Sequence, residues 1–163
     1  MGSRVPTPAI ASSGDPPRPD DPLIGILDDL VRETGAFLAL LVTESGQLLT
    51  ASGDVSSLDL VSSPGLECVA SVGSDECDRV ARDECVRLSN SVADETVWLQ
   101  RVRGWSLLSV AYSGTEHRAG VEAAIVSAAM ALGERLEDWF RTAPLGARPR
   151  ELTPERVRRL LRG

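Results

Sequence analysis

The chain has 163 residues, of which 42% are hydrophobic, and a formal net charge of −7. These values suit one globular domain with a real hydrophobic core rather than a disordered chain. Because phosphate binding needs a positive field, the acidic balance disfavours nucleic acid as a main partner. The longest apolar run, 37–42, is strand-sized, and no apolar signal region follows the N-terminus, so we expect a cytoplasmic protein without stable membrane insertion.

The N-terminal part predicts a tail followed by a helix. Residues 1–21 are rich in Pro, Ser, Gly and Asp and have no periodic apolar pattern, so we expect a disordered tail. A helix is predicted from Asp21, a capping residue, through Thr34, because Pro22 suits its first position and Gly35 ends it. Five apolar residues recur at helical spacing and predict its buried face: Leu23, Ile24, Leu27, Leu30 and Val31.

A hairpin is predicted next. Residues 36–43 form a nearly continuous apolar run, which is typical of a strand covered on both faces. Residues 44–46 predict a turn, and residues 47–52 predict the returning strand.

The middle of the chain contains two helical signals. Ser63 and Pro64 predict a helix start, and a small, apolar helix follows to Ser71. A charged helix is predicted over 75–88, and the sequence leaves open whether the two are one kinked helix or two. A short strand over 86–92 is a further possibility.

The second half predicts a second hairpin and a long helix. Residues 95–102 alternate in polarity, residues 105–112 are an apolar strand, and a helix is predicted over 116–142. Trp98 and Trp105 flank the hairpin turn. We interpret them first as a cross-strand aromatic pair, with an exposed binding anchor as the alternative.

The last segment, 144–163, predicts a linker and a short amphipathic helix. Thr153 caps this helix, Pro154 begins it, and Arg162 ends it. Such a short helix is marginal alone, so its apolar stripe needs a docking surface on this domain or on another chain. Its arginines suit an anionic membrane surface, an acidic protein groove or plain solvation. The apolar stripe consists of Leu152, Val157, Leu160 and Leu161.

No catalytic, cofactor or metal site is predicted. Three cysteines, Cys68, Cys77 and Cys85, could join His117 in a zinc site, but they lack the close pairs typical of one, so buried structural thiols are the default. A nucleophilic Cys–His pair has no supporting motif. The chain has no phosphate-binding loop with its lysine, so it is not itself a GTPase.

In order and spacing these elements resemble the roadblock (dynein light chain-like) family. The resemblance covers about residues 22–142. The segments that carry it are 27–34 leading into 35–42, the turn 44–49, the exit 51–53, the late strand 106–112 and the Ala-rich helix after it. The resemblance implies an α/β, profilin-like sandwich, with an approximately five-stranded, mostly antiparallel sheet flanked by helices.

Within the family, the tail after a Pro- and Gly-containing linker resembles MglB-type regulators of MglA-type small Ras-like GTPases. This resemblance implies a non-catalytic homodimer that binds such a GTPase and promotes its nucleotide turnover. The alternative is a roadblock scaffold that assembles larger complexes without affecting GTP turnover. We therefore divide the chain into a tail at 1–21, a roadblock-like domain at 22–142, and a linker with a short helix at 143–163. The predicted partner-binding residues are Ser63, Gly65, Leu66, Glu67, Ala70, Ser71, Leu152, Val157, Leu160 and Leu161.

Overall fold

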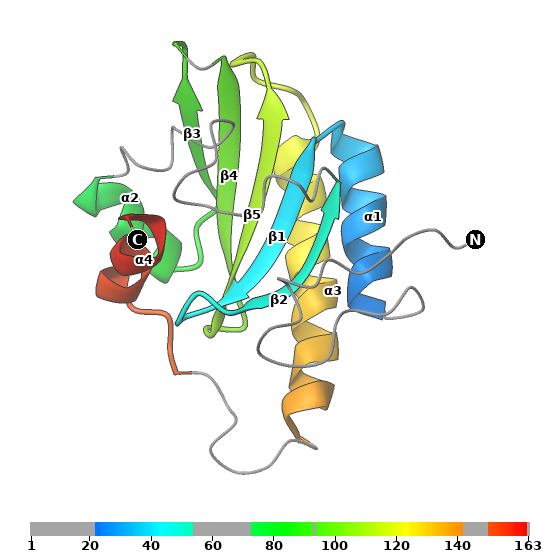
Figure 1. Cartoon of the computed structure of the whole chain (residues 1–163), viewed down its shortest axis with the longest axis vertical. Helices are drawn as coiled ribbons and strands as arrows, with labels where there is room; N and C mark the ends of the chain where they lie inside the picture. The colour runs from blue at the N-terminus through cyan, green and yellow to red at the C-terminus, as the bar shows by residue number, and fades with distance from the viewer. Residues whose placement is uncertain (1–21, 54–72, 93, 142–149, 163) are drawn as a thin grey trace.

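The computed structural model describes residues 22–53, 73–92, 94–141 and 150–162 (Figure 1). In these ranges it contains five strands in one antiparallel sheet, in the order β2-β1-β5-β4-β3. The elements in chain order are α1 (Pro22–Thr34), β1 (Leu38–Thr43), β2 (Leu48–Gly53), α2 (Ser74–Ala81), β3 (Val86–Asn90), β4 (Glu95–Val102), β5 (Ser106–Ser113), α3 (Val121–Arg141) and α4 (Pro154–Arg162).

The sheet lies between two pairs of helices (Figure 1). Helices α1 and α3 pack together and cover one face, and α2 and α4 pack together on the other. The predicted α/β sandwich with a five-stranded sheet between helices is therefore confirmed. None of the helices in the described ranges combines the length and apolarity needed to cross a membrane.

Strand β1 contributes side chains to both hydrophobic cores, which explains its continuous apolar sequence. All six of its residues are buried. Ala39 and Leu41 face the core under α1 and α3, whereas Leu38, Leu40 and Val42 face the core under α2 and α4. Successive side chains of a strand point to opposite faces, so a strand covered twice must be apolar throughout.

The predicted start of the long helix at Glu116 is wrong, because residues 114–120 form a loop and α3 begins at Val121. Arg118 connects this loop to the ends of α1 and β5. Its guanidinium donates to the carbonyl oxygens of Thr34 (3.1 Å) and Ser113 (3.0 Å) and lies 4.3 Å from the centre of the Tyr112 ring. Gly120, at φ +85°, then turns the chain into the helix.

The predicted charged helix over 75–88 is too long. Helix α2 ends at Ala81, and the rest of the predicted segment is a turn followed by β3. Asp83 takes a left-handed conformation (φ +68°), which short polar side chains tolerate and which ends a helix. Its carboxylate accepts two hydrogen bonds from Arg101 of β4, so a contact from a distant strand fixes this turn.

Trp98 and Trp105 do not form the predicted cross-strand pair. In the register of the sheet, Trp98 lies opposite Val110 on one side and Arg87 on the other. Trp98 is buried, and its indole N–H donates to the Tyr112 hydroxyl at 3.3 Å. Trp105 lies in the turn before β5 and packs at the edge of the same core.

Candidate protein-binding surfaces

Part of the predicted partner-binding set lies outside the described residues, as does Cys68. These are the residues of the small, apolar helix predicted before α2: Ser63, Gly65, Leu66, Glu67, Ala70 and Ser71. Their part in binding stays a prediction from the sequence.

The apolar stripe of the terminal helix docks on its own domain. Leu152, Val157 and Leu161 are at most 2% exposed and belong to the core between the sheet, α2 and α4. Leu160 is half-buried at the edge of this core, beside Gly46. Of the two docking surfaces that the sequence left open, the structure places the stripe on this chain.

Backbone and side-chain hydrogen bonds hold the terminal segment in place. The backbone N–H of Leu152 donates to the carbonyl oxygen of Gly104 at 2.6 Å, and that of Arg150 donates to Glu44 Oε1 at 3.1 Å. Arg158 donates to the hydroxyl of Ser74 at the start of α2 at 2.6 Å. Thr153 caps α4 as predicted, because its hydroxyl accepts from the backbone N–H of residue 156 at 3.3 Å.

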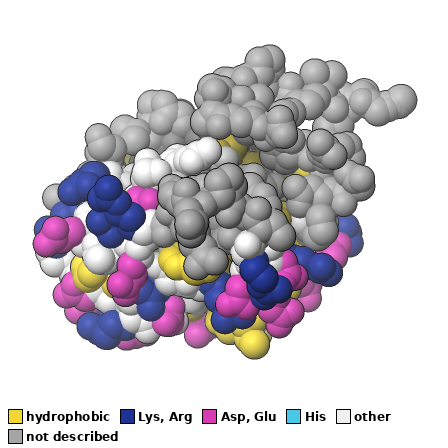
Figure 2. All heavy atoms as spheres, turned by 90° about the horizontal axis from the view of Figure 1, so that it is seen from below, with side chains coloured by type: hydrophobic (Ala, Val, Ile, Leu, Met, Phe, Trp, Pro, Cys, Tyr) yellow, Lys and Arg dark blue, Asp and Glu magenta, His cyan; other side chains and the backbone are white. Residues whose placement is uncertain are grey.

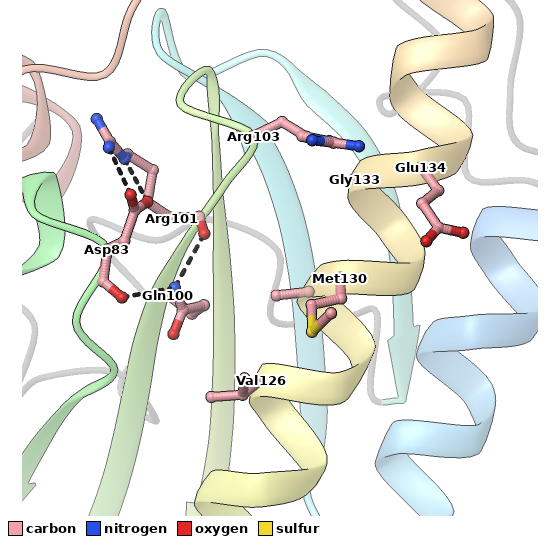
Figure 3. A pocket seen from close by; sticks show the side chains of 9 residues that line it. Asp83, Gln100, Arg101, Arg103, Val126, Met130, Gly133 and Glu134 are labelled. Carbon is pink, nitrogen blue, oxygen red and sulfur yellow. Dashed lines mark hydrogen bonds and ion pairs between the residues drawn. The ribbon is translucent and has the colours of Figure 1, made fainter.

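A pocket of about 270 Å³ lies on the other side of the sheet, between α3 and the end of β4 (Figure 3). One wall comes from α3 and contains two exposed apolar side chains, Val126 (39% exposed) and Met130 (66%). Gln100 and Arg101 of β4, with the turn residue Asp83, form the opposite wall. The remaining lining residues are Arg103, Ala129, Gly133 and Glu134.

The two arginines of the pocket are held by carboxylates. Arg101 makes a two-pronged ion pair with Asp83, at 2.8 and 2.9 Å, and these bonds lower the pKa of the Asp83 carboxyl from its usual value. Arg103 pairs with Glu137 of α3 at 3.3 Å. The Arg103 guanidinium is thus held against α3 at the pocket, whereas that of Arg101 points away from α3 and also lies 3.8 Å from Glu151.

Gln100 is the functional candidate that the sequence analysis missed. Its side-chain N–H₂ donates to the carbonyl oxygens of Asp83 (3.3 Å) and Arg101 (3.0 Å). Its side-chain oxygen is buried and has no hydrogen-bond partner among the described residues, and the residue is 6% exposed. The only sequence signal was an amide at a core-facing position of an alternating strand, which does not reveal a pocket.

Charged side chains of both signs are intermixed on the face seen in Figure 2. Small apolar areas lie between them on the described part of this face. Because neither sign forms a continuous patch there, this part of the surface does not favour a strongly charged partner.

The two described cysteines fit structural thiols. Cys77 is fully buried in the core under α2 and α4, and Cys85 is half-buried beside the other core. Burial first, and the nearby charge of Glu122 second, raise the pKa of the Cys85 thiol to about 12. No group of three or more potential metal ligands occurs within the described ranges.

This raised pKa predicts a slow thiol. Because the thiolate is the reactive form, we expect iodoacetamide at pH 8 to alkylate Cys85 at least about a hundredfold more slowly than free cysteine. Peptide mapping by mass spectrometry over time measures this rate. The rate should recover in denaturant and stay slow in Glu122→Gln, since burial is the larger cause. Alkylation of the folded protein at the rate of free cysteine would contradict the prediction.

The sheet order, the two helix pairs and the positions of α1 and α3 define the roadblock-type α/β fold. Among solved structures, the chain shares this fold with MglB of Myxococcus xanthus, at 19% identity and a TM-score of 0.55, over 74% of this chain and 99% of that one. The gliding protein MglB of Thermus thermophilus matches at 20% identity and a TM-score of 0.53, over 71% and 89%. An MglB with a tetrameric arrangement matches at 20% and 0.52, over 71% and 88%.

The structural likeness confirms the resemblance predicted from the sequence at the level of the fold. No model of a protein family matches the sequence, and no curated protein matches it.

Proposed function

We propose that this protein is a non-catalytic regulator that binds a small Ras-like GTPase of the MglA type and modulates its nucleotide cycle. The observation that carries the proposal is the fold shared with MglB structures over most of both chains. The roadblock-like order of segments and the terminal helix after a Pro- and Gly-containing linker support it from the sequence. We place this activity in the cytoplasm.

We further propose that the regulator works as a homodimer. One of the similar MglB structures has a tetrameric arrangement, which supports self-association of this fold. Sedimentation velocity of the full chain tests this, and a monomer at micromolar concentration would contradict it.

The proposed contacts differ in how accessible they are. Contact of a GTPase with Leu152, Val157 or Leu161 requires α4 to leave its site, because these side chains are buried. Contact with Leu160 requires a smaller displacement of α4, because Leu160 is half-buried at the edge of the core. The residues from Ser63 to Ser71 remain the other proposed contact.

The test is GTP hydrolysis by the MglA-type GTPase of the same organism, with and without this protein. We expect stimulation by the full chain and a loss of at least about tenfold in apparent affinity for Leu66→Asp, since a charge at an interface core is costly. Val92→Asp is the matched control, because Val92 is 95% exposed in a turn. Binding without stimulation would overturn the regulator and favour the scaffold. Absence of binding would overturn the regulator and leave only the roadblock-type fold.

A further inference from the structure

The pocket beside α3 combines three features that point to one kind of occupant. It has a buried hydrogen-bond acceptor without a partner among the described residues, the side-chain oxygen of Gln100. It has exposed apolar side chains, Val126 and Met130, on one wall. It has a guanidinium group, that of Arg103, which reaches toward α3 and is paired with Glu137 (Figure 3).

We propose that this pocket binds a tyrosine or tryptophan side chain presented by a partner protein. An aromatic ring suits the apolar wall, the Met130 thioether and the Arg103 guanidinium, since each attracts an aromatic ring. The single O–H or N–H donor of Tyr or Trp supplies what the Gln100 oxygen lacks. An unsatisfied buried acceptor is costly, so a ligand that satisfies it gains that free energy on binding.

The size of the pocket favours one side chain rather than a whole small-molecule ligand. Its volume of about 270 Å³ falls below the roughly 300–1,000 Å³ of most ligand pockets. Tyr and Trp are also the residues that most often anchor protein interfaces, in small pockets surrounded by a polar rim. Here the rim carries Asp83, Glu134 and the ion pair between Arg103 and Glu137.

Met130 provides the route into the pocket. The Gln100 oxygen is screened from solvent, so an entering side chain must displace a lining group. Met130 is two-thirds exposed, and an unbranched methionine changes conformation at low cost. The Gln100 amide itself stays in place, because its N–H₂ group donates to two backbone carbonyl oxygens.

The probe is N-acetyl-tyrosinamide, titrated into the full-length protein and followed by NMR at the Met130 methyl group and the Gln100 amide. N-acetyl-phenylalaninamide is the matched control, because it differs by one hydroxyl group. We expect saturable shifts at both positions with the tyrosine probe and about fivefold weaker binding of the phenylalanine probe. No saturable shift, or equal binding of the two probes, would overturn the proposal.

Two variants distinguish a loss of probe binding in the pocket from a loss of folding. Gln100→Leu should remove the preference for the hydroxyl group. This change also removes the Gln100 hydrogen bonds to the carbonyl oxygens of Asp83 and Arg101, so a second variant is needed. Val126→Asp, on the exposed face of α3, should abolish binding of both probes. Val92→Asp, the matched exposed control, should leave binding unchanged. Retained binding in Val126→Asp would contradict the assignment.

Self-association is the competing use of this surface. Met130→Asp should leave the sedimentation coefficient of the protein unchanged. A change to a smaller species would show that the pocket is an interface between copies and would overturn the proposal. None of these measurements involves a GTPase, so they test the pocket independently of the proposed GTPase regulation.

Discussion

Deletion of residues 150–163 is expected to remove most of the free energy of unfolding. Three apolar side chains of this segment, Leu152, Val157 and Leu161, are at most 2% exposed. Burial of each contributes about 1.5–3 kcal/mol, whereas whole domains are stable by only about 5–15 kcal/mol. The deletion also uncovers apolar side chains of α2 and the sheet, such as Val80 and Leu107, that lie in the same core.

Urea unfolding followed by circular dichroism measures the loss. Leu161→Ala, a milder change, should cost about 2–5 kcal/mol, as expected for a leucine truncated in a packed core. Arg159→Ala is the matched control on the exposed side of the same helix and should change stability by less than about 0.5 kcal/mol. If the truncated chain unfolds at the same urea concentration as the full chain, α4 contributes nothing to the core.

The stability of the docked helix bears directly on the proposed function. A GTPase that bound the apolar stripe of α4 would have to compete with α2 and the sheet for the same side chains. A ligand shifts such an equilibrium only by its differential affinity for the two states. The Leu161→Ala variant should therefore bind more tightly to a partner that needs α4 released, provided the partner does not contact Leu161 itself.

Helices and strands that are determined by the local sequence could be predicted from it. Strand β1 could be predicted because burial on both faces requires an unbroken apolar run, and α4 because Thr153 and Pro154 define its start. The alternation of residues 95–102 predicts a strand whose successive side chains face opposite sides, and the structure places Val97 and Leu99 in one core and Trp98 in the other.

Elements whose cause is a distant contact could not be predicted. Helix α2 ends at Ala81, before the left-handed Asp83, whose carboxylate is paired with Arg101 of another strand. Helix α3 starts late because Arg118 is held by carbonyl oxygens of α1 and β5. Local helical propensity extends both helices, and tertiary contacts override it.

The pocket is beyond sequence reasoning for the same reason. Its walls come from the turn at Asp83, the end of β4 and the middle of α3, which only the fold brings together. No local pattern around Gln100 distinguishes it from an ordinary polar residue of a strand.

Gly53→Ala is expected to destabilise the protein more than the same change at any loop glycine with open space around it. Gly53 has φ +97°, a conformation that disfavours a side chain. A β-carbon there would also lie 2.9 Å from the carbonyl carbon of Phe37 and 3.1 Å from the α-carbon of Leu38. These atoms cannot shift easily, because Leu38 pairs with Gly53 in the sheet and the Phe37 N–H bonds to Ala111.

Gly104→Ala isolates the steric part of this effect. Gly104 has a similar conformation (φ +79°), but a β-carbon there would meet no described atom within 4 Å. We expect a cost of about 1–2 kcal/mol for Gly104→Ala, from the backbone alone, and more than about 3 kcal/mol for Gly53→Ala. The difference between the two urea-unfolding free energies then measures how rigidly β1 is held between β2 and β5. Equal costs would mean that the end of β1 shifts freely, contrary to the pairing of β1 with both β2 and β5.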